Sequence, residues 1–260
     1  MDFGISTACL YPALIEDTVR YYCENGVQEL ELFVNSVGEA APAFLEQLQP
    51  ILRANGTRVV SIHPFTSGLE PLLFFSDYER RFEDGLKLYQ RFFDACNRLG
   101  ASILVFHGDR AESKNSDDRY FERFQKLYRA ARESGVCVAQ ENVSRCRSRE
   151  PAFLRKMRQQ LGEDVRFVLD LKQAQRSGYP VEEYMDAMGE QLCHLHLNDA
   201  NATQDCLLPG QGTRDFRSLF ENLSRRGFAG GGVIEVYREN FSRPEQLLES
   251  YGYLAGLQSR

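Results

Sequence analysis

Short runs rich in β-branched and aromatic residues alternate with longer amphipathic segments from one end of the chain to the other. The strand-like runs cover residues 3–7, 29–33, 58–63, 102–107, 136–142, 166–170, 193–197 and 232–236. The helix-like segments cover residues 13–25, 41–55, 77–99, 117–134, 151–161, 181–190, 215–226 and 244–258. Eight such pairs in 260 residues predict an α/β protein with a (β/α)8 TIM-barrel fold.

No linker, low-complexity tract or shift in composition divides the chain, so we expect one TIM-barrel domain over residues 1–260. The alternative for this pattern is a doubly wound open sheet, which normally carries a glycine-rich phosphate loop after its first strand. Here that turn reads Thr7-Ala8-Cys9-Leu10-Tyr11-Pro12 and contains no glycine. The closed barrel is therefore the better interpretation.

Composition points towards small-molecule chemistry. The formal net charge of −6 disfavours binding to nucleic acid or to an anionic membrane. The seven cysteines form no Cys-x-x-Cys pair, and residues 1–10 lack the pattern of a signal peptide. We therefore expect a cytoplasmic protein whose partner is a small molecule. The aromatic segment at 73–82 is typical either of a pocket wall or of a subunit contact, which leaves a homo-oligomer open.

Six successive strands end in, or close to, a histidine or a carboxylate. Active sites of (β/α)8 barrels lie at the C-terminal ends of the strands, where these side chains should meet. They are His63, His107, Glu141, Asp170, His196 and Glu235. Each one alone is more typical of a hydrogen-bonded structural residue, but three carboxylates crowded into one barrel mouth require a compensating cation. The oxygen-rich donor set favours Mn²⁺, with Mg²⁺, Co²⁺ or Zn²⁺ as alternatives.

At these positions the sequence resembles the xylose isomerase-like TIM-barrel superfamily, which includes sugar phosphate isomerases and epimerases and is related to AP endonuclease family 2. The resemblance runs over essentially the whole chain. It is carried by five fragments in order: "ENV" at 141–143, "VLD" at 168–170, "HLHLND" at 194–199, "LLPGQG" at 207–212 and "IEV" at 234–236.

The resemblance implies that one divalent ion is held by Glu141, Asp170, His196 and Glu235. It also implies that Glu141 and Glu235 form the acid/base pair, without saying which is the base. One removes a carbon-bound proton from a metal-chelated sugar and the other returns it through a cis-enediolate.

His63 and His107 match histidines that hold a second metal in the AP-endonuclease branch, so they are candidates for a second metal or for substrate. The third metal site of that branch is absent, because Gln173 and Gln204-Asp205-Cys206 stand where its histidines and aspartate would be. This departure and the acidic charge disfavour a phosphodiesterase that acts on DNA.

Four further residues are assigned by position. Lys172 and Gln173 follow Asp170, and Glu31 lies near the end of its strand, so we expect all three to contact substrate. For Lys172 and Glu31, a solvated side chain at the strand end is the competing interpretation. Asp199 is expected to orient His196 by a hydrogen bond. The remaining histidine, His194, is expected to be a hydrogen-bonded core residue.

The sequence thus predicts a metal-dependent isomerase or epimerase of a small sugar, sugar phosphate, sugar acid or cyclitol. A metal-dependent lyase or dehydratase on the same scaffold is the alternative within enzymes. A barrel that binds a sugar without catalysis is the alternative outside them.

Overall fold

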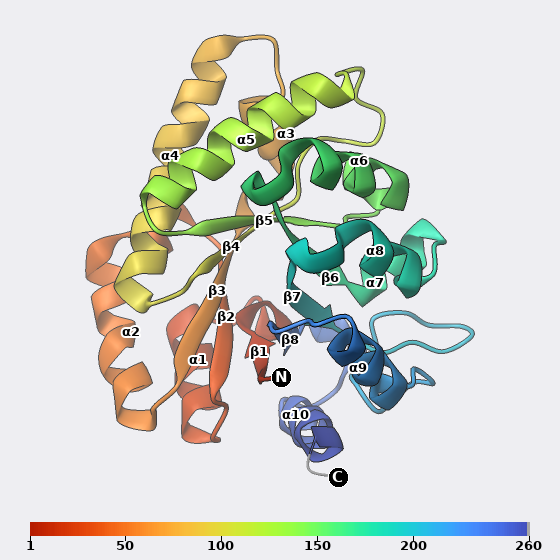
Figure 1. Ribbon diagram of the computed structural model, residues 1–260. Coiled ribbons are helices and arrows are strands. Elements are labelled where there is room, and N and C mark those ends of the chain that lie inside the picture. The colour runs from red at the N-terminus through yellow and green to blue at the C-terminus, as the bar shows by residue number, and fades with distance from the viewer. Residues whose placement is uncertain (259–260) are drawn as a thin grey trace.

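The computed structural model describes residues 1–258 and contains a closed barrel of eight parallel strands in the order of the sequence (Figure 1). Each strand pairs with the next, and the first pairs with the last. The strands are β1 Phe3–Ser6, β2 Glu29–Val34, β3 Arg58–Pro64, β4 Ile103–Phe106, β5 Cys137–Glu141, β6 Arg166–Asp170, β7 Leu192–Leu197 and β8 Gly231–Ile234. The predicted (β/α)8 fold is confirmed.

Eight α-helices match the expected segments: α1 Ile15–Glu24, α2 Pro42–Asn55, α4 Glu79–Leu99, α5 Asp117–Glu133, α6 Pro151–Leu161, α8 Val181–Met188, α9 Phe216–Arg225 and α10 Glu245–Gln258. Two short helices, α3 Glu70–Phe74 and α7 Leu171–Ser177, are additional. Both are too short to show a helical period in the sequence. Asp170 caps α7 by accepting hydrogen bonds from the backbone N–H groups of Lys172 and Gln173.

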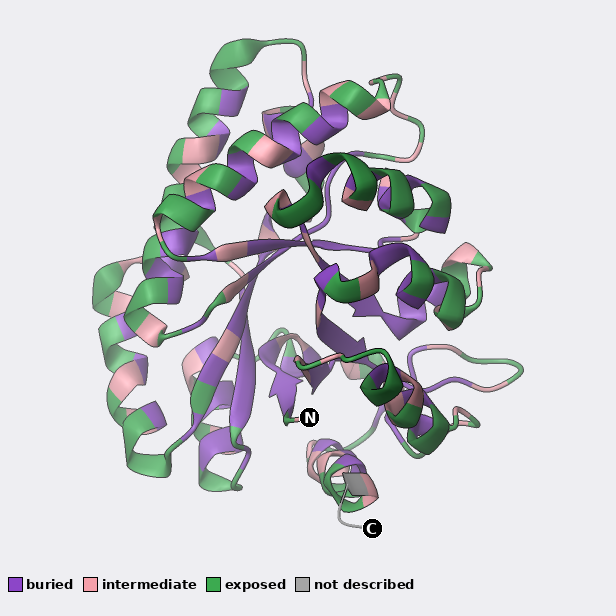
Figure 2. Cartoon of the chain, viewed as in Figure 1, coloured by how far each residue is buried: buried purple, intermediate pink, exposed green. Residues whose placement is uncertain are grey.

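Burial separates the barrel from its covering layer (Figure 2). The strands are almost wholly buried, whereas each outer helix has one exposed face. In α4, for example, buried residues recur every three or four positions, at Phe82, Gly85, Tyr89, Phe92 and Cys96. The barrel is thus a rigid frame that positions the side chains at its C-terminal end.

Three of the four aromatic residues in the segment 73–82 belong to this core: Phe74, Phe75 and Phe82. Phe74 packs edge-on against Phe106 with ring centroids 5.6 Å apart, and Phe75 stacks on Tyr120 at 4.4 Å. Tyr78 is exposed. Phe74 and Phe75 therefore pack on β4 and α5 and do not project as a subunit contact.

No helix among residues 1–258 combines the length and the apolar character needed to cross a membrane.

The strand register brings two predicted ligands side by side, since Asp170 of β6 pairs directly with His196 of β7.

Candidate metal centre

All six residues predicted at the strand ends meet at one end of the barrel. The six side chains are buried, and the most exposed of them, Glu235, is only 8% exposed. These side chains, together with Glu31, form three overlapping groups. Within each group, the ligand atoms all lie within 4.8 Å of one another. One of the groups is Glu141, Asp170, His196 and Glu235, which is the set implied by the sequence resemblance.

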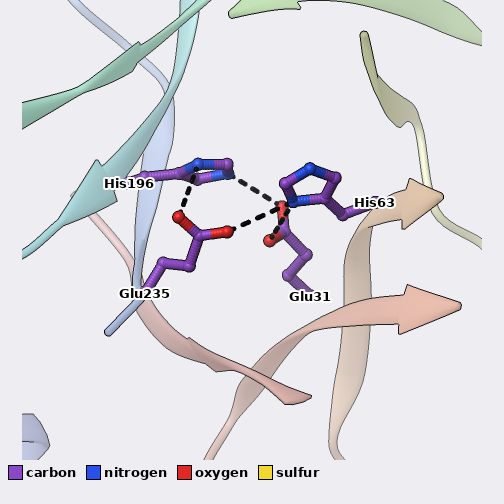
Figure 3. A group of neighbouring side chains, drawn as sticks. All are labelled: Glu31, His63, His196 and Glu235. Atoms are coloured by element: carbon purple, nitrogen blue, oxygen red, sulfur yellow. Dashed lines mark hydrogen bonds and ion pairs between the residues drawn. The ribbon is translucent and has the colours of Figure 1, made fainter. Parts of the chain in front are cut away.

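His196 lies at the centre of this four-ligand set. Its Nδ1 is 3.4 Å from Oε1 of Glu141, 3.4 Å from Oε2 of Glu235 and 3.8 Å from Oδ2 of Asp170. Figure 3 shows His196 and Glu235 facing each other across this space. Three carboxylate oxygens and one imidazole nitrogen thus converge on one point.

Hydrogen bonding within the set leaves two atoms that suit a cation. Oδ1 of Asp170 accepts hydrogen bonds from the backbone N–H of Lys172 at 2.7 Å and from the side-chain amide of Asn198 at 3.2 Å. Its Oδ2 is buried without a hydrogen bond, and so is Nδ1 of His196. Buried polar atoms are almost always paired, so a divalent ion that accepts both atoms as ligands fits this donor set.

Glu31 occupies the other side of His196. Its Oε2 is 3.1 Å from Nε2 of His196 and accepts a hydrogen bond from the hydroxyl of Ser61 at 2.8 Å. Its Oε1 is 3.5 Å from Nδ1 of His63 (Figure 3). A carboxylate on one ring nitrogen fixes the orientation of the imidazole and directs the other nitrogen to a metal. Glu31 is fully buried, so the interpretation as a solvated carboxylate is wrong.

Glu141 and Glu235 each direct their two oxygens at different histidines. One oxygen of each glutamate faces His196, as described above. The other oxygen faces a histidine from β3 or from the end of β4: Oε1 of Glu235 is 3.3 Å from Nδ1 of His63, and Oε2 of Glu141 is 3.4 Å from Nε2 of His107. The two imidazoles meet at 2.8 Å between their Nε2 atoms.

Lys172 is buried inside the site. Its Nζ is 3.0 Å from Oε2 of Glu235 and 3.2 Å from Oδ2 of Asp170, and it lies over the ring of Tyr237. The interpretation of Lys172 as a solvated side chain is therefore wrong. Its ammonium compensates two of the carboxylates that would hold a metal.

Two other predicted residues stabilise loops. The side chain of Asp199 accepts four hydrogen bonds from backbone N–H groups, those of residues 200, 210, 212 and 214, instead of bonding to His196 as expected. Gln173 accepts hydrogen bonds from the backbone N–H and the hydroxyl of Ser144. His194 lies one layer deeper, within 3.4 Å of the Ser61 hydroxyl, as expected of a core histidine.

Opposite charges at short range dominate the electrostatics. Burial raises the pKa of Glu141, but the neighbouring imidazole of His196, 3.4 Å away, overcomes this effect and lowers the pKa to about 2. Burial likewise opposes ionisation of Glu235, yet Lys172 and His196 keep its pKa well below the usual value. Burial lowers the pKa of His63, but the carboxylates of Glu235 and Glu31 outweigh this effect and raise the pKa to about 10. Without metal, the site is thus a network of carboxylates and imidazolium ions.

The pKa of His196 is also raised well above its usual value, because nearby carboxylates outweigh the effect of burial. A metal ion that binds Nδ1 of His196 therefore has to displace a proton from it.

One functional candidate, Glu70, is missing from the sequence prediction. It begins α3, is fully buried, and lies 3.2 Å from Nδ1 of His107. The sequence offers only a weak signal for it, a glutamate before Pro71 in the loop after β3.

Residues 20–257 match the family model described as a xylose isomerase-like TIM barrel. The chain belongs to this family. An uncharacterized protein of Mycobacterium leprae (strain TN) is 27% identical over 257 residues, which cover 90% of this chain and 88% of the relative.

Three solved structures with the same fold are informative. A D-tagatose 3-epimerase-like protein superposes with a TM-score of 0.82 and 17% identity, covering 100% of this chain and 97% of that one. D-psicose 3-epimerase from Clostridium cellulolyticum H10, solved with D-tagatose, gives 0.81 and 15%, with coverages of 100% and 99%. A probable 3-DHS dehydratase from Bacillus anthracis gives 0.75 and 13%, also with 100% and 99%. At these identities the likeness concerns the fold.

Proposed function

We propose that this protein is a divalent-metal-dependent isomerase or epimerase of a small sugar, sugar phosphate, sugar acid or cyclitol. The observation that carries the proposal is the convergence of Glu141, Asp170, His196 and Glu235 within 4.8 Å, with two glutamates among the four. Adjacent hydroxyl and carbonyl oxygens of the substrate would chelate such an ion, whose charge would stabilise the negative charge of a cis-enediolate. We propose Mn²⁺ as the resident ion.

Glu141 and Glu235 then exchange the proton. Their lowered pKa values keep both as carboxylates, so either can accept the carbon-bound proton. Each glutamate offers one oxygen to the ligand set and keeps the other beside a histidine, where it is free for proton transfer. Return of the proton at the next carbon, by the glutamate that accepted it, gives isomerisation. Epimerisation requires a proton from the glutamate on the opposite face, and when this is Glu235 the neighbouring His63 can supply that proton.

The surrounding residues orient this pair. Glu31 fixes His196 from behind, and Lys172 holds the Oε2 atom of Glu235. His63 and His107 contact the free glutamate oxygens, so we place them on the substrate side of the site. We propose that the Lys172 ammonium also approaches a substrate oxygen once the ion binds Asp170 and Glu235.

A dehydratase is the second candidate, because a probable dehydratase shares the fold over the full length of this chain. There the same base removes the proton and a β-hydroxyl group leaves. The product would then have lost water, whereas an isomer or epimer has the mass of the substrate.

Metal content and proton exchange test the proposal together. Protein produced with Mn²⁺ should bind about one ion per chain, and an NMR screen of ketoses, aldoses, inososes and their phosphates in D2O should reveal substrate that takes up deuterium. Glu141→Gln and Glu235→Gln should each slow this uptake by at least about 10²-fold, the usual contribution of a general base. Glu122→Gln, on the exposed face of α5, is the matched control.

Absence of bound metal, or undiminished exchange in both glutamine variants, would overturn the mechanism. Sugar binding without any exchange would instead indicate a binding protein.

A further inference from the structure

Glu70 is a buried carboxylate that the proposed reaction does not use. It belongs to α3, after β3, and its Oε2 accepts hydrogen bonds from the backbone N–H groups of His107 at 2.9 Å and Gly108 at 2.6 Å. Gly108 has a φ of 91°, and a Cβ atom there would lie 1.9 Å from the hydroxyl oxygen of Tyr120. Only glycine therefore allows the turn after β4 to present both amides to Glu70.

The other oxygen, Oε1, contacts side chains. It accepts a hydrogen bond from the hydroxyl of Tyr89 at 2.8 Å and lies 3.2 Å from Nδ1 of His107. An ionised carboxylate can only accept hydrogen bonds. The contact with His107 is therefore a bond only when the imidazole carries its proton on Nδ1.

A neutral imidazole with its proton on Nδ1 has a lone pair on Nε2. In His107 this Nε2 atom lies 2.8 Å from Nε2 of His63, which must then be the donor, and 3.4 Å from Oε2 of Glu141. This single lone pair therefore accepts the N–H of His63. The bond fixes the ring of His63, whose Nδ1 atom lies 3.3 Å from Oε1 of Glu235.

We propose that Glu70 is a positioning residue, which holds His107 in the tautomer with the proton on Nδ1, so that the Nε2 atom of His107 accepts the N–H of His63 and orients His63 beside Glu235. The tautomer follows from the contacts of His107 with Glu70 and His63. The effect of the orientation of His63 on the reaction rests on the proposed function.

The variant Glu70→Gln reverses the tautomer by a simple constraint. The atom that accepts the two backbone N–H groups must remain an oxygen, so the new amide NH₂ has to face His107. Nδ1 of His107 must then accept, which moves the proton to Nε2. That proton points at His63 or Glu141 and removes the acceptor of the His63 N–H.

Tyr89→Phe is the matched control. It deletes another hydrogen bond to the same Oε1 atom and leaves the carboxylate facing His107. The tautomer of His107 should therefore not change.

The test is ¹⁵N NMR of the histidine rings in metal-free protein at pH 8, with His107 assigned from a His107→Ala spectrum. Wild type and Tyr89→Phe should show the proton on Nδ1, and Glu70→Gln should show it on Nε2. A proton on Nε2 in wild type, or an unchanged tautomer in Glu70→Gln, would overturn the proposal. The wild-type spectrum decides the matter even if Glu70→Gln does not fold.

A separate measurement concerns the reaction. Glu70→Gln should slow deuterium uptake by about 10–100-fold, as expected of a residue that orients another. A changed tautomer with an undiminished rate would refute the role of the orientation of His63 in the reaction. A wild-type enzyme that exchanges no substrate proton would refute the proposed function and leave the tautomer assignment intact.

Discussion

Two carboxylates in this barrel, Asp170 and Glu70, are both fully buried, but they differ in what remains unpaired. Both oxygens of Glu70 are used by protein hydrogen-bond donors. Asp170 has one such oxygen, while Oδ2 has no hydrogen bond and faces His196 and Lys172. A carboxylate whose oxygens are all bonded fixes geometry, whereas one with a free buried oxygen is suited to bind a cation.

The largest expected effect concerns the cation already present beside Asp170. Lys172→Met leaves Asp170 and Glu235 without their ammonium partner, and removal of one member of a buried ion pair costs about 3–5 kcal/mol. Urea denaturation of the metal-free protein should show this loss, and saturating Mn²⁺ should recover much of it. Lys156→Met, which removes an exposed ion pair with Asp117, should cost at most about 1 kcal/mol. Equal losses in the two variants would contradict this view of Asp170.

The next effect distinguishes the four-ligand set around His196 from the group formed by His63, His107 and Glu141. Asp170→Asn keeps the capping oxygen but directs an amide NH₂ at His196, so Mn²⁺ affinity should fall by at least about 100-fold, or about 2.8 kcal/mol. His107→Ala should stay within about the tenfold of an outer partner. Isothermal titration calorimetry measures both. The reverse order would place the ion in the group formed by His63, His107 and Glu141.

The smallest effect is the pH dependence of metal binding. Because the pKa of His196 is raised well above 6.5 in the metal-free site, a bound ion must displace the proton from its Nδ1 atom. Raising the pH removes that proton, so affinity should increase from pH 7 to pH 8 by up to about tenfold, or about 1.4 kcal/mol. Calorimetry in buffers of different ionisation enthalpy should detect about one proton released per ion. Binding without proton release would contradict the protonated state of His196.

The sequence predicted the strand ends well because a histidine or a carboxylate occurs at or near the end of six of the buried runs. His63, Glu141, Asp170, His196 and Glu235 all occupy the common site for that reason. The loops were harder to interpret. Asp199 binds loop amides instead of His196, because the segment after β7 folds back over Asp199. No periodicity in the sequence predicts that turn.

Glu70 was not predicted from the sequence, for a related reason. It lies 37 residues before His107, on a five-residue helix that is too short to have a recognisable period. Its importance depends on β3 and β4 being neighbours and on the tight turn at Gly108. None of these features can be seen at Glu70 itself.

The sequence by itself determined the barrel and which side chains reach its C-terminal end, because strand and helix periods and strand ends are local properties of the chain. Only the tertiary structure decided which atom of each side chain faces which partner: Glu31 behind His196, Lys172 against Asp170 and Glu235, and Glu70 against His107. These contacts depend on barrel register and loop closure between distant segments, and a local sequence pattern does not encode them.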